Sequence, residues 1–187
     1  CSRYRDPAEE TMKIANYRWL AAVIAAHPNR ELLGRTRLQK TIKLLQRLGF
    51  PTDYDYTNFF YGPYSESVQA DVGLLCHLGL IEEKEFSRGD GNPYYKFTAT
   101  AGADLEEINP YRSSIQTLSQ TETIVLELAA TYDSYLEMGF STKEALHLLH
   151  KKKRDKCTRE RVHQAMELLQ SMGLINSIEH TPQIQND

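Results

Sequence analysis

The chain has 187 residues, of which 41% are hydrophobic and 25% are charged, and it contains 10 Gly and 7 Pro. This length allows one domain or two small ones, and this composition excludes a collagen-like, low-complexity or wholly disordered chain. The formal net charge of −3 argues against a protein that coats nucleic acid without sequence preference, because such binding grows with the number of phosphates neutralised.

Helical periodicity dominates the first fifty residues. Apolar residues at three- and four-residue spacing predict one helix over residues 8–26. A second helix is expected from Thr36 to Leu48, ended by Gly49 and Pro51.

The next segment is rich in aromatic residues. Residues 54–61 predict a short strand, and Gly62-Pro63 is expected to turn the chain. Ser65 can then cap a third helix, which Gly79 ends.

Two alternating segments follow, Leu80–Phe86 and Tyr94–Thr98, and the turn-forming residues between them predict a β-hairpin. A short helix is expected over Ala101–Ile108. The order helix, helix, strand, helix, strand, turn, strand is that of a winged helix-turn-helix. Residues 1–112 are therefore predicted to form such a domain, with an N-terminal helix.

Beyond a polar hinge predicted at residues 110–118, the pattern is again helical. Capping boxes at Ser119–Glu122 and Ser141–Glu144 predict the starts of two helices. The helices expected in this part cover residues 120–138, 142–153 and 159–172.

The predicted fold class is α+β, mainly α with a small β-hairpin: a winged helix-turn-helix and then a C-terminal three-helix module. Residues 118–180 are expected to form that module, which resembles a second winged helix, and residues 181–187 a flexible tail. An internal similarity between Leu74–Ile81 and Leu168–Ile175 favours two related modules. The alternative is that any helix with a glycine C-cap and an apolar extension has this form.

Charge is distributed unevenly along the chain. Residues 1–50 hold 10 Lys and Arg against 4 Asp and Glu, residues 51–110 hold 3 against 11, and residues 111–187 hold 9 against 10. Such segregation is typical of a surface that meets a polyanion or a charged partner. Three cysteines are too few for a disulfide framework, and no apolar run approaches a membrane span or a signal peptide. We therefore expect a cytoplasmic protein without membrane contact.

Three sequence elements carry a resemblance to a known family. They are the run RLQKTIKLLQRLGF at residues 37–50, FYGPYS at residues 60–65 and LGLI at residues 78–81. Together they resemble the YwgA-like family, prokaryotic proteins predicted to be winged-helix proteins with no agreed function. The LQK and YGP elements more distantly resemble the Panacea antitoxin domain. Both resemblances imply a fold and a set of binding roles, and neither implies a catalytic motif.

The second helix carries the first candidate for nucleic-acid contact. Its cations are expected to lie on the solvated face and its margin, opposite the apolar set, where they can contact DNA phosphates. The alternative is an ordinary solvated helix face. The residues are Arg35, Arg37, Lys40, Lys43 and Arg47.

The third helix and the hairpin would hold the recognition position and the wing. Gln69 can pair with adenine, and Arg88 at the hairpin tip can enter a minor groove or contact a phosphate. The outward positions of this helix otherwise lack Lys and Arg, and Glu66 would repel phosphate. This face is therefore as suitable for a protein partner as for DNA.

A second basic cluster lies at residues 151–161. It can contact DNA, or it can stabilise the end of a helix through the macrodipole. Its candidate residues are Lys151, Lys152, Lys153, Arg154, Arg159 and Arg161.

The sequence contains no signature of an enzyme. Phosphate-loop, nucleophile-elbow and His-Glu-x-x-His motifs are absent, so we expect neither catalysis nor a cofactor. His147, His150, Cys157 and His163 are residue types that bind zinc, but their spacing matches no zinc motif and no metal is expected.

Two hypotheses follow. The first is a DNA-binding winged-helix protein that regulates transcription as a homodimer, and it requires the two cationic stretches to gather on one surface. The alternative is a protein-interaction module, such as an antitoxin or an adaptor, that uses the winged-helix fold without DNA.

Overall fold

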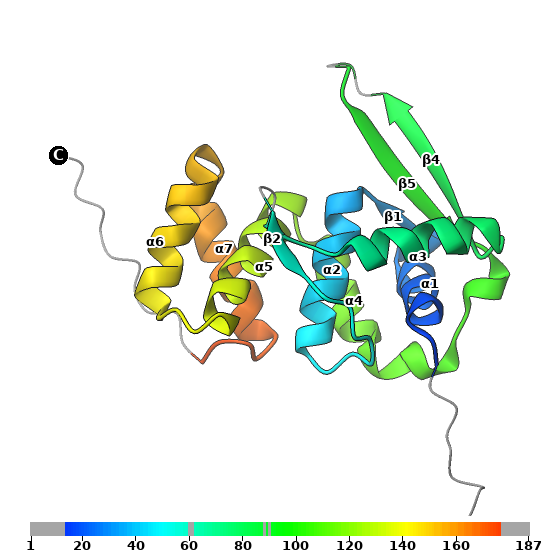
Figure 1. Cartoon of the computed structure of the whole chain (residues 1–187), viewed down its shortest axis with the longest axis horizontal. Helices are drawn as coiled ribbons and strands as arrows, with labels where there is room; N and C mark the ends of the chain where they lie inside the picture. Colours follow the sequence, from blue (N-terminus) through cyan, green and yellow to red (C-terminus); the bar gives the residue numbers. More distant parts are fainter. Residues whose placement is uncertain (1–13, 60–61, 88, 90, 177–187) are drawn as a thin grey trace, which may run out of the picture.

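The computed structural model describes residues 14–59, 62–87, 89 and 91–176. These residues form helices and short strands in one chain (Figure 1). The α-helices are α1 (Asn16–Ala26), α2 (Arg35–Arg47), α3 (Glu66–His77), α4 (Arg112–Gln120), α5 (Thr123–Glu137), α6 (Thr142–Lys153) and α7 (Arg159–Ser171). The strands are β1 (Glu31–Leu33), β2 (Thr57–Phe59), β3 (Gly62–Tyr64), β4 (Ile81–Ser87) and β5 (Pro93–Ala99). Short 3₁₀ helices are η2 (Pro28–Arg30), η3 (Ala101–Ala103), η4 (Glu106–Tyr111) and η5 (Arg154–Lys156).

A three-stranded antiparallel sheet lies beside α1, α2 and α3. Its strand order is β1-β5-β4, with Leu32 opposite Phe97 and Glu83 opposite Phe97 on the other edge of β5. The far part of the β4–β5 hairpin projects from the body of the molecule as an arm (Figure 1). The base of the hairpin is buried through Ile81 and Phe97, while the outer part of β4 is exposed.

Helix α1 forms the centre of this half of the protein. Residues 19–24 are buried without interruption, because α3, α4 and β5 pack around the helix from different sides. At the start of the helix, the Trp19 ring meets the rings of Phe50 and Tyr111 edge to face. Edge-to-face contacts of this kind add to the burial of apolar area. The Trp19 ring therefore joins the start of α1 to Phe50, which follows α2, and to Tyr111 of η4.

Helix α5 holds the C-terminal helices to the rest of the chain. Residues 125–135 are all buried, because α2 and β3 pack on one side of α5 while α6 and α7 pack on the other. Helix α4 precedes α5 and contacts both α1 and α2. None of the helices within the described ranges has the length and apolar character to span a membrane.

The structure confirms the α+β class and most of the predicted elements. Helices α2, α3, α6 and α7 lie within one or two residues of their predicted bounds, and the β4–β5 hairpin is present. Ser65 caps α3 by accepting from the Val68 N–H, and Ser141 and Glu144 form the predicted capping box of α6. Helix α1 begins at Asn16, and residues 8–13 of the predicted first helix lie outside the described residues.

The sequence does not predict two short strands, β1 and β3. Strand β1 has three residues, too few for an alternating pattern, and Leu33 is exposed where Leu32 is buried. The prediction that Gly62-Pro63 turns the chain is wrong, since both residues belong to β3 and pair with Phe59 and Asn58. Proline is tolerated here because β3 is an edge strand.

The predicted hinge at residues 110–118 is also wrong, because α4 occupies residues 112–120. Its Ile115 and Leu118 are buried, and the hydroxyl and amide side chains between them give the segment its polar composition. The capping box predicted at Ser119–Glu122 does not form, since Ser119 lies inside α4 and donates to the carbonyl of Gln116. In place of the helix predicted at 101–108 the chain forms η3 and η4.

The internal similarity has a local explanation. After α3 the Leu80 N–H donates to the Leu75 carbonyl, and after α7 the Leu174 N–H donates to the Leu169 carbonyl. The same bond from the residue after a glycine closes α2 and α5, through Phe50 and Phe140. The two similar segments therefore share a common form of helix end, and their similarity does not require a repeated module.

Candidate functional site

Two glutamines of α2 bind the backbone of the segment at residues 54–65. The Gln39 amide donates to the Ser65 carbonyl and accepts from the Ser65 N–H, both at 2.9 Å. Seven residues later, the Gln46 amide makes the same pair of bonds to Tyr54, at 2.9 and 3.1 Å. Residues seven apart lie on the same face of a helix. One face of α2 therefore fixes both ends of this segment and, through Ser65, the start of α3.

Replacing Gln39 with alanine is expected to lower the free energy of unfolding by about 2 kcal/mol. Gln39 and Ser65 are both buried, so the variant leaves the Ser65 N–H without its acceptor and without water. Chemical denaturation of the two proteins measures the difference.

The matched control is Gln164→Ala, which removes an exposed glutamine side chain from the middle of α7. Its effect is expected to stay within about 0.5 kcal/mol. Equal stability of the Gln39 and Gln164 variants would show that the paired bonds to Ser65 do not support the fold.

The prediction that the cations of α2 lie on a solvated face is wrong for Lys40 and Lys43, which are both buried. Lys40 is only 2% exposed, and its Nζ donates to the Pro63 carbonyl at 2.5 Å. Burial lowers the pKa of Lys40 to about 8, against the opposing charge of Glu127. Lys43 is buried and pairs with Glu137. These side chains have no path to a DNA phosphate in this structure.

Ion pairs between α2 and α5 explain why this face of α2 is buried. Lys43 and Arg47 lie one turn apart on α2, and Asp133 and Glu137 lie one turn apart on α5. Arg47 donates to both oxygens of Asp133, at 2.8 and 3.2 Å, and lies 3.4 Å from Glu137. Asp133 is fully buried, and its ion pair compensates the loss of hydration. The helical period of the sequence predicts that these cations lie on one side of α2, but it does not predict that α5 covers them.

The remaining two cations lie at the N-terminus of α2. Arg37 is half-buried and donates to the carbonyls of Leu118 and Ser119 and to the Thr123 hydroxyl. Arg35 is exposed, pairs with Glu83 at 2.8 Å and lies over the ring of Tyr95. Both therefore contact a groove between the sheet, α2 and α4.

The outward face of α3 is exposed as predicted. Val68, Val72 and Leu75 are buried against the core. The opposite side presents a stripe at four-residue spacing, Glu66, Ala70, Leu74 and Leu78, and it contains no Lys or Arg. Exposed fractions of 39% for Leu74 and 50% for Leu78 make this stripe partly apolar. Gln69 is half-buried beside it.

A groove of about 580 Å³ separates α3 from the N-terminal half of α2. Gln39 and Lys40 form part of its lining, and Glu66 and Gln69 of α3 border it, together with Tyr64. The groove and the outward face of α3 together form the surface that we call the α3 surface.

The β4–β5 hairpin, predicted as a wing, is acidic rather than basic over its described part. Glu82 and Glu85 of β4 are exposed, and Lys84 pairs with Glu82 at 3.1 Å. Lys96 of β5 pairs with Glu31 at 2.8 Å. Arg88, the predicted wing contact, lies outside the described residues.

The second basic cluster is only partly exposed. Lys153 is buried and pairs with Glu127 at 2.7 Å, and Lys156 pairs with the same carboxylate at 2.9 Å. Lys152 and Arg161 are half-buried. Lys151, Arg154 and Arg159 are exposed at the α6–α7 end of the molecule.

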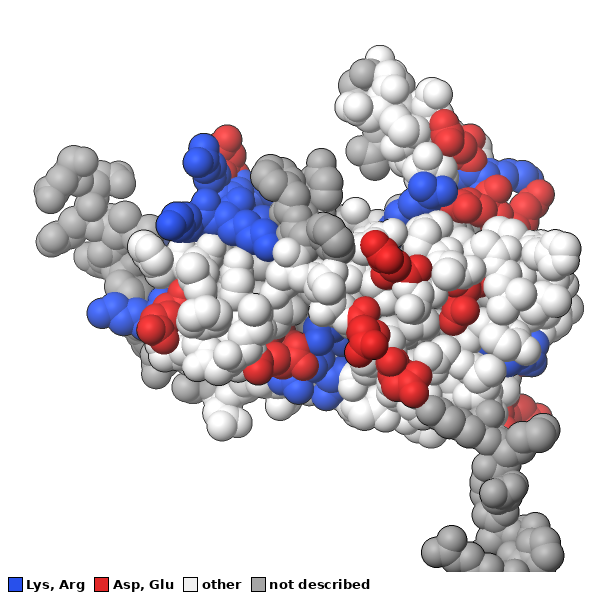
Figure 2. Space-filling model, viewed as in Figure 1, with Lys and Arg blue, Asp and Glu red and all other residues white. Residues whose placement is uncertain are grey.

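The two cationic stretches do not form one surface. Figure 2 shows several separate groups of Lys and Arg side chains, among them one over α6 and one beside the β4–β5 hairpin, with Asp and Glu side chains next to both. Between them, Lys40 and Lys43 are enclosed by α5 and the β2–β3 hairpin. Sequence reasoning missed Glu127, Asp133 and Glu137. The available signal was their place in α5, a helix of otherwise mainly apolar residues.

No group of three or more His, Cys, Asp or Glu side chains in the described part of the chain has the geometry to hold a metal ion. Cys76 and Cys157 are free thiols in this part. Burial raises the pKa of Cys157 to about 11, which keeps the thiol protonated near neutral pH.

Among known proteins, the chain is similar to Uncharacterized protein YwgA of Bacillus subtilis (strain 168). The two chains are 30% identical over 152 residues, which cover 78% of this chain and 90% of the relative. No protein-family model matches the chain. The name of the relative states no ligand, partner or activity.

Proposed function

Since the chain belongs to the YwgA-like family, we propose that it is a winged-helix protein that binds a protein partner through the α3 surface, as an antitoxin or adaptor does. The connectivity supports the winged-helix assignment: α1, β1, α2 and α3 are followed by the β4–β5 hairpin, and β1 pairs with β5. In this fold α3 holds the position of the recognition helix.

The observation that carries the proposal is the charge of the recognition position. A helix that reads DNA needs donors for base edges and cations for the flanking phosphates. Helix α3 has neither Lys nor Arg, and Glu66, Glu82 and Glu85 are exposed on it and on the wing. These carboxylates would repel the phosphate backbone, whereas they suit a partner with a basic rim.

The shape of the α3 surface also suits a protein. The small Ala70 and Gly73 allow a partner helix to approach closely, and Leu74 and Leu78 offer apolar area next to them. The groove beside α3 provides a place for a side chain of the partner. Exposed apolar area with a charged rim is typical of a protein interface.

Replacing Leu74 with glutamate is expected to abolish partner binding without unfolding the protein. The side chain is exposed, so its replacement costs little stability, but it places a charge at the centre of the proposed interface. The measurement is co-purification of the tagged chain from its native host, followed by light scattering to obtain the stoichiometry of any complex.

Met138→Glu provides the control. Met138 follows the end of α5 and is 62% exposed, more than the 39% of Leu74. A stoichiometric protein retained by the wild type and by Met138→Glu, and lost from Leu74→Glu, supports the proposal. Loss from both variants, or from neither, would refute an interface on the α3 surface.

A second candidate function rests on the basic end of the molecule. Lys151, Arg154 and Arg159 are exposed near the junction of α6 and α7. Three cations in reach of one phosphate backbone favour salt-dependent DNA binding, and a homodimer would double the contacts. Under this alternative the purified chain carries nucleic acid, and Lys151→Glu with Arg154→Glu releases it while Leu74→Glu has no effect.

A further inference from the structure

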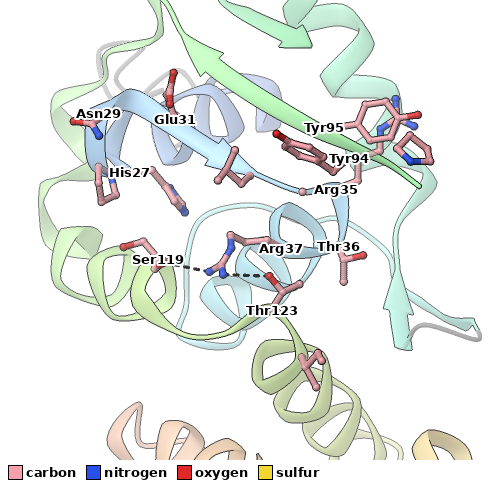
Figure 3. Close-up of a pocket in the computed structure, with 15 residues that line it drawn as sticks. His27, Asn29, Glu31, Arg35, Thr36, Arg37, Tyr94, Tyr95, Ser119 and Thr123 are labelled. Carbon is pink, nitrogen blue, oxygen red and sulfur yellow. Dashed lines mark hydrogen bonds between the residues drawn. The ribbon is translucent and has the colours of Figure 1, made fainter. Parts of the chain in front are cut away.

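A second groove lies at the N-terminus of α2, and it shares Arg35 and Thr36 with the groove of the α3 surface (Figure 3). Its volume is about 1030 Å³, and η2, β1, β5, the first turn of α2 and the α4–α5 junction form its walls. This volume is at the upper end of the range for small-molecule sites and greatly exceeds that of an inorganic ion. The groove therefore has room for an organic ligand.

The first turn of α2 gives the groove a positive electrostatic potential. The backbone N–H groups of a helix N-terminus carry partial positive charge, and among the described residues no side chain caps those of α2. This turn contains Arg35 and Arg37 and no acidic residue, the reverse of the arrangement that stabilises an isolated helix. The positive charges of the helix end and of both guanidinium groups thus add together.

Arg37 carries a half-buried charge that no carboxylate balances within the described residues. Its partners are two carbonyls from the last turn of α4 and the Thr123 hydroxyl (Figure 3). The partial negative charge of a helix end compensates only part of a full positive charge. Burial lowers the pKa of Arg37, in keeping with this unbalanced position. An anion in the groove would supply the missing charge.

His27 provides a second and independent indication of a ligand. The side chain is 5% exposed and lines the groove. Its Nδ1 lies 2.8 Å from the Val23 carbonyl and must donate to it, because a carbonyl oxygen only accepts. In the neutral ring Nε2 is then an acceptor, and it has no partner among the described residues. A buried acceptor without a donor is costly, so a ligand that donates a hydrogen bond here would be favoured.

From these contacts we propose that the groove binds the phosphate group of a phosphorylated small molecule. The anion lies at the N-terminus of α2 between Arg35 and Arg37, and a hydroxyl of the phosphate or of the adjoining molecule donates to Nε2 of His27. Tyr94 and Tyr95 provide an aromatic wall for the rest of the molecule. This ligand site borders the α3 surface at Arg35 and Thr36, and it does not depend on the proposed function.

Two features of the groove limit what can bind. Glu31 also lines it but is paired with Lys96, and Glu83 competes for Arg35 through a solvent-accessible ion pair. Arg35 is the exposed member of this pair and Glu83 is half-buried, so an anion must share Arg35 with Glu83. A phosphodiester has no P–OH and cannot donate to His27 from its phosphate, which disfavours a nucleic-acid backbone.

Calorimetric titration of the full chain tests the proposal with four probes: inorganic phosphate, sulfate, adenosine monophosphate and a short DNA duplex. We expect saturable binding of inorganic phosphate and tighter binding of adenosine monophosphate. Sulfate has no O–H and is expected to bind about tenfold more weakly than phosphate at the same ionic strength, the usual effect of one lost hydrogen bond to a buried acceptor.

Two variants and a control locate the site. Arg35→Gln is expected to weaken phosphate binding about tenfold, and His27→Phe to abolish the preference for phosphate over sulfate. Arg30→Gln is the control, since Arg30 makes a similar ion pair, with Asp104, but does not line the groove.

The proposal is overturned if phosphate and adenosine monophosphate do not saturate at concentrations up to about 10 mM. Equal effects of the Arg35 and Arg30 variants, or tighter binding of a DNA duplex that Arg35→Gln weakens, would also overturn it. If His27→Phe does not fold, the Arg35 and Arg30 variants and the phosphate-to-sulfate comparison on the wild type still decide.

Discussion

Replacing Glu127 with alanine is expected to lower the free energy of unfolding by about 3–5 kcal/mol near neutral pH. Glu127 is buried on α5 and accepts from the ammonium groups of Lys153 and Lys156. Its charge also favours the protonated form of the buried Lys40. Without this carboxylate, Lys40 and Lys153 are like charges in a site with little water. Urea denaturation measures the loss.

The pH dependence of this variant gives a further test. Burial lowers the pKa values of Lys40 and Lys153 in the folded state, and removal of Glu127 lowers them further. Between the lowered folded pKa and the ordinary value, the unfolded chain binds more protons, so stability rises with pH in that window. The destabilisation by Glu127→Ala is therefore expected to be smaller near pH 9 than near pH 7.

Glu107→Ala is the matched control, because Glu107 is an exposed carboxylate on η4. Its effect is expected to stay within about 0.5 kcal/mol. A Glu127 variant as stable as this control, or one whose loss of stability grows from neutral to alkaline pH, would contradict the role given to the carboxylate.

Replacing Gly62 with alanine is expected to lower the free energy of unfolding by about 3 kcal/mol. Gly62 begins β3 with a φ of +90°, which side-chain-bearing residues rarely adopt. A Cβ at this position would overlap the Thr131 hydroxyl of α5 and approach the end of the Lys40 side chain. The variant thus combines backbone strain with a clash in the contact between β3 and α5. Thermal and chemical unfolding of the variant and the wild type give the difference.

Two further variants separate these causes. Gly73→Ala in α3 has open space for its Cβ and a helical backbone, so it is expected to raise stability by about 0.5–1 kcal/mol. Thr131→Ala in the Gly62→Ala background removes the overlapping hydroxyl and is expected to restore about 1 kcal/mol. No coupling between positions 62 and 131 would show that the close approach of β3 to α5 is absent in solution.

Residues that carry the family resemblance have a structural role. The LQK and YGP elements, at residues 38–40 and 61–63, include three residues that hold α2, β3 and α5 together. Gln39 and Lys40 bind the backbone of Pro63 and Ser65, and Gly62 permits the approach of α5. These motif residues therefore support the arrangement of α2, β3 and α3. The partner or ligand would be bound by other residues.

Local signals in the sequence predicted the helices, the β4–β5 hairpin, the Ser65 cap and the α6 capping box. These features depend on hydrogen bonds and side-chain spacing within a few residues, which a sequence displays directly. The outward face of α3 was also correct, because Val68, Val72 and Leu75 fix the orientation of the helix. The absence of Lys and Arg from that face, the basis of the proposed function, needed no coordinates.

The environment of each charged side chain was decided by the tertiary structure alone. Helical periodicity placed Lys40, Lys43 and Arg47 on one side of α2 but could not show what covers that side. The answer lies about ninety residues later along the chain, where Asp133 and Glu137 of α5 pair with Arg47 and Lys43. The carboxylate that acts on Lys40 is Glu127 of the same helix. In the same way, the groove at the N-terminus of α2 exists only because α4 and the sheet close around Arg37 and His27. A period along a chain specifies a direction from the helix axis, and only long-range packing determines whether water, a carboxylate or a ligand lies there.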